Sequence, residues 1–237
     1  MKAMILAAGF GTRLGSLTNT TPKILIDING KSVLELILTN LQKHGFDDII
    51  INVHYLADMV EEEAFKLGEK LGIKISISDE REKLLDTGGG VYKAREFFQN
   101  ESFLLYNGDI LTDINLKAFY NFHIRKEAAA TVAIRERPGT RFFLIDDAGR
   151  IRGWTNRQTG VDIVTIDEPM ELKEIASMAL TVISPKIFEY MEDGIYSMTS
   201  ILLDMAADEL ITTFVHNSGH WIDIGSPEKL EEARKLY

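Results

Sequence analysis

The first 107 residues alternate between short apolar runs and amphipathic segments, and this alternation constrains the fold more than any other feature of the chain. Apolar runs predict strands, and apolar residues at helical spacing predict helices. The strands are expected at residues 2–8, 47–53, 73–78 and 102–107, and the helices at 32–44, 58–71 and 90–98. Strands that are apolar throughout and separated by helices are typical of a mostly parallel sheet with helices on both faces. The sequence therefore predicts an α/β fold.

The second half of the chain is less regular. Strands are expected at residues 129–136, 141–146, 150–154 and 175–184, and helices at 115–126, 185–191, 198–209 and 226–237. The polar stretch 153–171 is expected to be a long loop or insertion. No composition shift marks a domain boundary, so we expect one domain over residues 1–237.

Composition excludes several classes of function. The chain has no cysteine, which rules out disulfides and cysteine-bound metals. A formal net charge of −10 over 237 residues argues against a nucleic-acid partner. No apolar run approaches the ~18 residues of a membrane span, and we expect a cytoplasmic protein. An anionic ligand would have to be bound by local cations, backbone N–H groups or a metal. The sequence does not predict the oligomeric state.

The loop after the first predicted strand combines glycines with two cations. In "LAAGFGTRL" Gly9 and Gly11 allow close approach of a ligand to the backbone, and Arg13 and Lys23 add positive charge. Ligands of open parallel sheets bind beyond the carboxyl ends of the strands, where this loop begins. Leu14 replaces the third glycine of the dinucleotide fingerprint, and no Gly-Lys-Ser/Thr follows. Phosphate binding and a tight turn with two solvated cations both remain open.

Two aspartates are candidates for a metal site. Asp109 follows an apolar strand in "LLYNGDIL", and Asp223 lies between isoleucines in "WIDIGSP". Mg²⁺ prefers oxygen ligands and needs only one or two protein carboxylates when phosphates complete its shell. The alternatives are an Asx-type turn at Asp109 and a carboxylate at the end of a helix at Asp223.

A third cluster of glycines, Gly88–Gly90 in "LDTGGG", is expected to precede a helix. A planar base could rest against such backbone, and a flexible turn is the alternative. Glu80 and Glu82 are the nearby candidates to contact the base edge. A carboxylate accepts hydrogen bonds from uracil or guanine alike, so these residues leave the base undetermined.

The chain resembles the sugar-1-phosphate nucleotidyltransferases through "LAAGFGTRL…TPK", "NGD", "WIDIG" and "LDTGGG". The resemblance implies a Rossmann-like, GT-A-like fold with a mixed, mostly parallel sheet. It divides the chain into a nucleotide-binding half over residues 1–115 and a sugar-binding half over 116–237. It also implies catalytic roles for Arg13, Lys23, Asp109 and Asp223, with Mg²⁺ held by the two aspartates. The implied nucleotide-binding residues are Ala7, Ala8, Gly9, Gly11, Thr12, Arg13, Glu80, Gly88, Gly89 and Asn107.

The sugar side departs from the family pattern. "GRIRGWTNRQTG" replaces the usual Glu-Lys-Pro, and Ala179 stands where many relatives have glycine. Lys23, Arg157 and Ala179 are the candidates to contact the sugar phosphate. Ser16 replaces a proline of the opening loop.

Within the family, the chain most resembles the N-acetylmuramate-1-phosphate uridylyltransferases, which implies UTP and a role in cell-wall sugar recycling. The mannose- and heptose-1-phosphate guanylyltransferases, which use GTP, share many of the same features. A phosphocholine cytidylyltransferase and a regulatory subunit that binds nucleotide without turnover are further alternatives.

Overall fold

The computed structural model describes residues 1–166 and 170–237, which pack as two compact units. The first unit comprises Met1–Leu85, Leu105–Lys117 and Gly219–Tyr237, and the second comprises Asp86–Leu104 and Ala118–Ser218. The chain therefore passes between the units several times, and the C-terminal segment belongs to the same unit as the opening loop.

The first unit contains a parallel sheet. Strands β1 (Lys2–Leu6), β4 (Asp48–Val53) and β5 (Lys74–Asp79) run parallel, and β6 (Phe103–Asn107) borders β1 on its other side. The carboxyl ends of β1, β4 and β5 therefore meet at one edge of the sheet. The opening loop starts at that edge.

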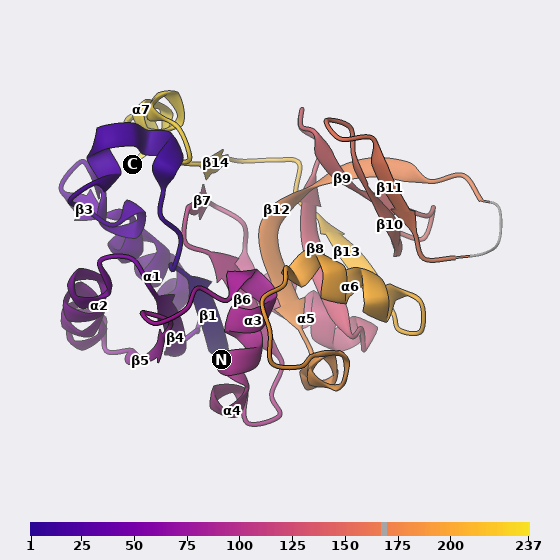
Figure 1. Cartoon of the computed structure of the whole chain (residues 1–237), viewed down its shortest axis with the longest axis horizontal. Coiled ribbons are helices and arrows are strands. Elements are labelled where there is room, and N and C mark those ends of the chain that lie inside the picture. The colour runs from indigo at the N-terminus through magenta and orange to yellow at the C-terminus, as the bar shows by residue number, and fades with distance from the viewer. Residues whose placement is uncertain (167–169) are drawn as a thin grey trace. The chain divides into compact units, whose positions relative to one another are not determined.

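Helices α1 (Val33–Lys43) and α2 (Ala57–Leu71) pack against each other, and α2 covers β4 and β5 (Figure 1). Ser32 caps α1 by accepting a hydrogen bond from the N–H of Glu35 at 3.1 Å. The helix stops before Gly45, whose φ of 84° is readily adopted only by glycine. Both boundaries lie within one residue of the helix predicted at 32–44. The C-terminal helix α7 (Pro227–Leu236) starts after the Ser226 cap.

Six short elements complete the first unit. They are the 3₁₀ segments η1 (Thr12–Thr18) and η2 (Lys23–Leu25) and the strands β2 (Asp27–Ile28), β3 (Lys31–Ser32), β7 (Ile110–Thr112) and β14 (Trp221–Asp223). Strands β7 and β14 pair antiparallel. Neither was predicted, because three residues are too few to show a period of two.

The sheet of the second unit is mainly antiparallel. Its strands are β8 (Ala130–Arg135), β9 (Arg141–Ile145), β10 (Ile151–Asn156), β11 (Val161–Val164), β12 (Lys173–Ile183) and β13 (Ile211–Val215). The order is β11-β10-β9-β12, β8 pairs antiparallel with β12, and β13 pairs parallel with β8. The predicted α/β fold with a mixed sheet is confirmed, and the sheet is partly parallel.

The helices of this region are α3 (Asp86–Lys93), α4 (Arg95–Phe98), α5 (Leu116–Lys126), η3 (Pro185–Tyr190) and α6 (Met198–Ala206). Helix α6 packs on α3, β10 and β13. The single helix expected at 90–98 is wrong, since α3 begins at Asp86 and contains the glycine run.

The long loop expected at 153–171 is wrong where strands interrupt it. Residues 153–156 belong to β10 and residues 161–164 form β11, and the two strands pair in a hairpin. Three of the four residues of β11, Val161, Ile163 and Val164, are apolar but exposed, and the strand was missed because the stretch around it is polar. Residues 167–169 of the expected loop lie outside the described residues.

Among the residues that the structure describes, no helix is both long and apolar enough to cross a membrane.

Candidate active site

The structure brings the four predicted charged residues together within the first unit. Lys23 Nζ donates a hydrogen bond of 2.6 Å to Asp109 Oδ2 and lies 3.9 Å from Asp223 Oδ1. Arg13 Nη2 lies 3.8 Å from Asp223 Oδ2. Two carboxylates and two cations therefore form one cluster, although up to 210 positions separate them in the sequence.

The β7–β14 ladder brings the two carboxylates together. Asp223 pairs with Ile110, the residue that follows Asp109. The N–H of Ile224 donates to the carbonyl oxygen of Asp109 at 3.0 Å. The short ladder thus positions a residue from the C-terminal segment against the end of β6.

Tyr106 supports the same turn from inside the core. Its hydroxyl donates to the carbonyl oxygen of Ile110 at 3.0 Å, and its side chain is fully buried. Burial raises the pKa of Tyr106, so the phenol stays neutral and keeps the proton that it donates. Strand β7 is thereby held at its first residue.

Glycines at two positions allow the close approaches on which the cluster depends. A Cβ on Gly108 would lie 2.7 Å from the carbonyl oxygen of Leu6 at the end of β1. A Cβ on Gly225 would lie 2.5 Å from Arg13 Nη2 and 2.7 Å from Asp223 Oδ1. Neither glycine was singled out from the sequence, because such crowding comes from distant segments.

The opening loop is folded around Gly11 and Thr18. Gly11 has a φ of 67°, and a Cβ there would lie 2.9 Å from Thr18 Cγ2 and 3.1 Å from Lys23 Cβ. The Thr18 hydroxyl contacts the carbonyl oxygens of Gly11 at 3.1 Å and Gly15 at 3.2 Å. Gly11 is therefore required both by its conformation and by the packing that places Lys23.

Gly9 differs from Gly11. Its φ is not in the left-handed region, and no described atom outside residues 8–10 lies within 4 Å of the place its Cβ would take. Neither strain nor packing among the described residues requires glycine here. The open space leaves this backbone accessible to a ligand. Ala8 beside it is buried, whereas Thr12 and Arg13 are exposed.

The two cations differ in their exposure to solvent. The Lys23 side chain is 13% exposed and lies among the carboxylates, whereas the Arg13 side chain is 68% exposed. Lys23 is thus fixed by its partners. Among the described residues Arg13 has one long ion-pair contact, to Asp223, and it retains donors for an incoming anion.

The donor set of the aspartate pair fits a hard divalent cation. Both carboxylates already converge on one positive group, the Lys23 ammonium, and both side chains are partly exposed, at 27% for Asp109 and 35% for Asp223. Within residues 1–166 and 170–237 no three acidic or histidine side chains converge as a metal cluster. Mg²⁺ bound by two carboxylates would take its other ligands from phosphates and water.

The two acidic candidates for the base edge differ in environment. Glu80 is 1% exposed, and its Oε1 and Oε2 accept from Asn52 Nδ2 at 2.8 Å and from the N–H of Leu85 at 3.1 Å. Glu82 is exposed. Asn52 was not singled out from the sequence, although a polar residue in the apolar run "IIINV" was a signal. Asn107 ends β6 and is half-buried.

Four predicted ligand-binding residues belong to the second unit. Gly88 and Gly89 lie inside α3, not before it, and the N–H of Gly88 donates to the carbonyl oxygen of Tyr196 at 2.8 Å. A Cβ on Gly88 would lie 2.5 Å from Tyr196 Cδ2, so packing requires this glycine.

Arg157 and Ala179 are the other two. Arg157 Nη2 pairs with Glu174 Oε2 at 2.6 Å, and the guanidinium lies 5.1 Å from the centroid of the Phe142 ring. Ala179 has a φ of 59° at a register irregularity between β12 and β8. Its N–H donates to Ser177 Oγ at 2.9 Å.

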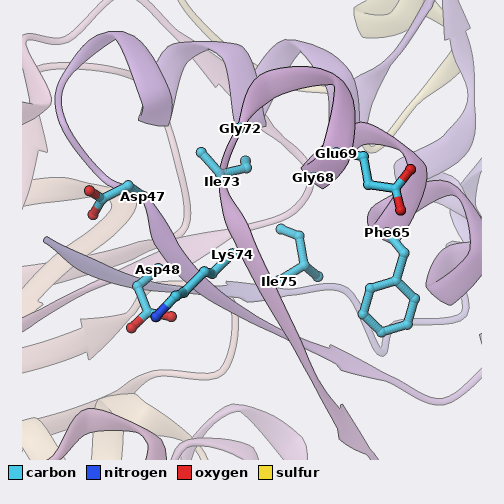
Figure 2. A pocket seen from close by; sticks show the side chains of 9 residues that line it. All are labelled: Asp47, Asp48, Phe65, Gly68, Glu69, Gly72, Ile73, Lys74 and Ile75. Carbon is cyan, nitrogen blue, oxygen red and sulfur yellow. The ribbon is translucent and has the colours of Figure 1, made fainter.

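A separate hollow of about 740 Å³ lies where α2 passes the first residues of β4 and β5 (Figure 2). Asp48 and Lys74, which begin these strands, line it together with Phe65 of α2. It is therefore at the amino ends of the parallel strands, opposite the edge at which the opening loop starts. None of the predicted site residues lines it.

Comparisons with known proteins identify the family of this chain. A family model described as nucleotidyl transferase matches residues 2–237. The chain is 32% identical to a UTP–glucose-1-phosphate uridylyltransferase from Synechocystis, over 95% of this chain and 60% of the relative. It is 30% identical to an N-acetylmuramate alpha-1-phosphate uridylyltransferase from Neisseria meningitidis, over 100% of this chain and 98% of the relative.

A mannose-1-phosphate guanyltransferase beta-B from Xenopus laevis is 31% identical over 100% of this chain and 64% of its own length. The chain thus spans about three fifths of two of these relatives and nearly all of the third. Among solved structures, HddC from Yersinia pseudotuberculosis shares the fold with a TM-score of 0.77, at 24% identity over 99% of this chain and 98% of that one. The predicted family is confirmed, and the chain belongs to the nucleotidyl transferase family of enzymes.

Proposed function

We propose that this protein is a sugar-1-phosphate nucleotidyltransferase, which converts an NTP and a sugar 1-phosphate into an NDP-sugar and pyrophosphate. The observation that carries the proposal is the cluster in which Lys23 lies between Asp109 and Asp223, with Arg13 beside Asp223. A reaction between two anionic phosphates requires such a mixture of cations and metal-binding carboxylates.

The nucleophile is a phosphate oxygen of the sugar 1-phosphate, which attacks the α-phosphorus in line and displaces pyrophosphate. This oxygen is already anionic, so no protein base is required. Catalysis then depends on positioning and charge neutralisation. Exposed Arg13 would hold the triphosphate and the charge that develops on pyrophosphate, and Lys23 would lie beside the reacting phosphates.

Asp109 and Asp223 would hold Mg²⁺. When bound, the ion supplies charge stabilisation for the phosphate oxygens at which negative charge develops. Lys23 bonds to Asp109 at 2.6 Å and would neutralise part of the carboxylate charge beside the ion.

We propose that the nucleotide binds to the loop after β1 and to the other residues that the family resemblance implies. Open backbone at Gly9 and the exposed Thr12 support this assignment for the phosphates. The other proposed contacts are Ala7, Ala8, Gly11, Gly88, Gly89 and Asn107. We propose that residues 1–115 mainly bind the nucleotide and 116–237 mainly bind the sugar.

The favoured substrates are UTP and N-acetylmuramate 1-phosphate. Support comes from the Neisseria relative, which bears that name and matches over 98% of its length. The Synechocystis relative is also named as a uridylyltransferase. The runner-up is a mannose- or heptose-1-phosphate guanylyltransferase with GTP, because the Xenopus relative is equally similar at 31%.

Lys23, Arg157 and Ala179 are the proposed contacts of the sugar phosphate. Arg157 is paired with Glu174 at 2.6 Å, so it would have to exchange this partner for the phosphate. The methyl group of Ala179 would narrow the space beside the sugar relative to glycine.

The test is pyrophosphate release over a grid of NTPs and acceptors with Mg²⁺. The acceptors are the 1-phosphates of N-acetylmuramate, N-acetylglucosamine, mannose, heptose and glucose, with phosphocholine as the acceptor of the cytidylyltransferase alternative. Asp109→Asn provides the active-site control, and its turnover should be far below that of the parent protein.

Dominant turnover of UTP with N-acetylmuramate 1-phosphate would support the favoured substrates and a role in cell-wall sugar recycling. A signal dominated by GTP would favour the guanylyltransferase alternative. Nucleotide binding without turnover of any pair would overturn the proposed catalysis in favour of a regulatory subunit. Unchanged turnover in Asp109→Asn would contradict the metal assignment.

A further inference from the structure

Asn52 is a buried polar residue in an otherwise apolar strand. It lies near the carboxyl end of β4, opposite Leu6 of β1 and Ser78 of β5, and is 3% exposed. A buried amide without bonding partners is strongly unfavourable, so its partners indicate why asparagine is tolerated there.

The side chain of Asn52 connects two segments at the carboxyl edge of the sheet. Asn52 Oδ1 accepts from the N–H of Ala7 at 2.7 Å, and Asn52 Nδ2 donates to Glu80 Oε1 at 2.8 Å. Ala7 is the first residue after β1, where the opening loop starts. The N–H of Leu85 donates to the other Glu80 oxygen at 3.1 Å, which continues the chain of bonds.

This chain of bonds has a fixed polarity. It runs from the N–H of Ala7 to an acceptor on Asn52, then from a donor on Asn52 to a carboxylate that also receives the N–H of Leu85. Only a side chain with one acceptor and one donor can occupy the middle position. Aspartate would place two carboxylates together, and alanine would leave the N–H of Ala7 without its partner.

Neighbouring residues hold the outer part of the same loop. The Tyr55 hydroxyl donates to the carbonyl oxygen of Asn19 at 2.9 Å, and the Phe10 ring lies edge-on to His54 with centroids 5.3 Å apart. The segment 52–55 therefore contacts the opening loop near its start, at Phe10 and just after η1.

We infer that Asn52 is a positioning residue for the nucleotide loop, acting through Ala7, and that Glu80 orients Asn52 instead of contacting the base. The inference rests on the proposed function. Glu80 is 1% exposed and both of its oxygens are occupied, which suits a support better than a ligand contact.

The polarity of the bonds provides the test. Asn52→Asp alone sets two carboxylates against each other, and Glu80→Gln alone leaves one donor facing another donor. In the double variant the acceptor for Ala7 lies on Asp at position 52. The amide donor lies on Gln at position 80, whose oxygen still accepts from Leu85. All three hydrogen bonds can therefore form, with the negative charge moved from position 80 to position 52.

The measurements are kcat and KM for UTP and GTP with Mg²⁺, and hydrogen exchange of residues 4–19 in the free protein. Each single variant should raise KM for the NTP about 10- to 100-fold, as expected for the loss of one hydrogen bond to a charged group, with a smaller change in kcat. Exchange of residues 4–19 should accelerate. The double variant should restore both quantities to near the parent values.

Gln42→Ala is the matched control, since it removes a side-chain amide that donates to the carbonyl oxygen of Leu71 between α1 and α2. It should leave KM and loop exchange unchanged. Unchanged KM and loop exchange in Asn52→Asp would overturn the inference. A double variant whose KM and loop exchange are no closer to the parent values than those of the single variants would also overturn it. So would a double variant with restored loop exchange but an altered preference between UTP and GTP, because Glu80 would then contact the base. If the parent protein has no turnover the proposed function fails, whereas hydrogen exchange still tests the support of the loop.

Discussion

Gly225 and Arg13 come so close that any side chain at position 225 would meet the guanidinium. A Cβ on Gly225 would lie 2.5 Å from Arg13 Nη2, well inside contact distance. The N–H of Gly225 also donates to Asp223 Oδ1 at 2.9 Å, which fixes the carboxylate on the same side. Gly225 therefore determines the space in which the exposed cation meets the aspartate.

Gly225→Ala is expected to displace Arg13 without unfolding the protein, because a flexible side chain can move away. Displacing a positioning group by about 1 Å can change rates by up to about 100-fold, so kcat/KM should fall about 10- to 100-fold. Steady-state pyrophosphate release measures the change. Gly139→Ala is the matched control, since its Cβ would meet nothing closer than 3.4 Å. Equal kcat/KM in both variants would contradict this role of Gly225.

Lys23→Met is expected to lower turnover about 10²- to 10³-fold, the effect of losing one group that stabilises developing charge. Lys23 lies within 4 Å of both aspartates, so methionine would also leave the carboxylates without their shared cation. Single-turnover kinetics at saturating NTP measures the chemical step. Lys70→Met removes a comparable pair, at 2.8 Å from Glu35 but exposed, and should leave turnover unchanged. A loss confined to KM would show that Lys23 only binds substrate.

His123 is expected to make the protein less stable in mild acid. Burial lowers the pKa of His123 from 6.5 to about 4, and its ring nitrogen Nδ1 contacts Thr131 Oγ1 at 3.0 Å. At a pH between these two pKa values, His123 is therefore protonated in the unfolded chain but neutral in the folded protein. The free energy of unfolding is therefore unaffected by His123 above pH 6.5. It decreases as the pH falls toward 4, with a slope of up to about 1.4 kcal/mol per pH unit.

Urea unfolding at pH 7.5, 5.5 and 4.5 measures this slope. His123→Gln removes the titrating group and keeps an amide that can bond to Thr131. The variant should show a smaller loss of unfolding free energy on acidification than the parent protein. Parallel curves for the two proteins would assign the acid sensitivity to other groups.

The sequence was sufficient for the elements whose signals are local. Helix α1 has a serine cap, a stripe of apolar residues and a glycine stop, and its bounds match the prediction within one residue. Strands β1 and β4 are apolar runs that a parallel sheet buries on both faces, whereas β5, at the edge of the sheet, alternates isoleucine with polar residues. Such signals depend only on neighbouring residues.

Features made by distant segments could not be predicted in the same way. Strand β14 has three residues and exists because β7 pairs with it. The crowding at Gly108 and Gly225 comes from β1 and from Arg13, far away in the sequence. The charged residues of the site were predicted because their types and spacing are characteristic, whereas the supports around them depend on the folded chain.

Ala179→Gly is expected to stabilise the protein while changing its choice of acceptor. Ala179 has a φ of 59°, a conformation that is strained for alanine and relaxed for glycine. Relief of strain should exceed the greater entropy of glycine in the unfolded chain, so the free energy of unfolding should rise by about 1 kcal/mol. Removing the methyl group should also widen the proposed sugar site and raise turnover of bulkier sugar 1-phosphates.

Thermal unfolding and the acceptor grid test the two halves of this prediction separately. Ala148→Gly is the matched control, because Ala148 lies in a turn without a positive φ and should lose about 0.5 kcal/mol instead. Destabilisation of Ala179→Gly by as much as the control would show that the backbone at position 179 is not strained. Stabilisation with an unchanged acceptor profile would place Ala179 outside the sugar site. Its positive φ would then be due to the irregular β12–β8 pairing alone.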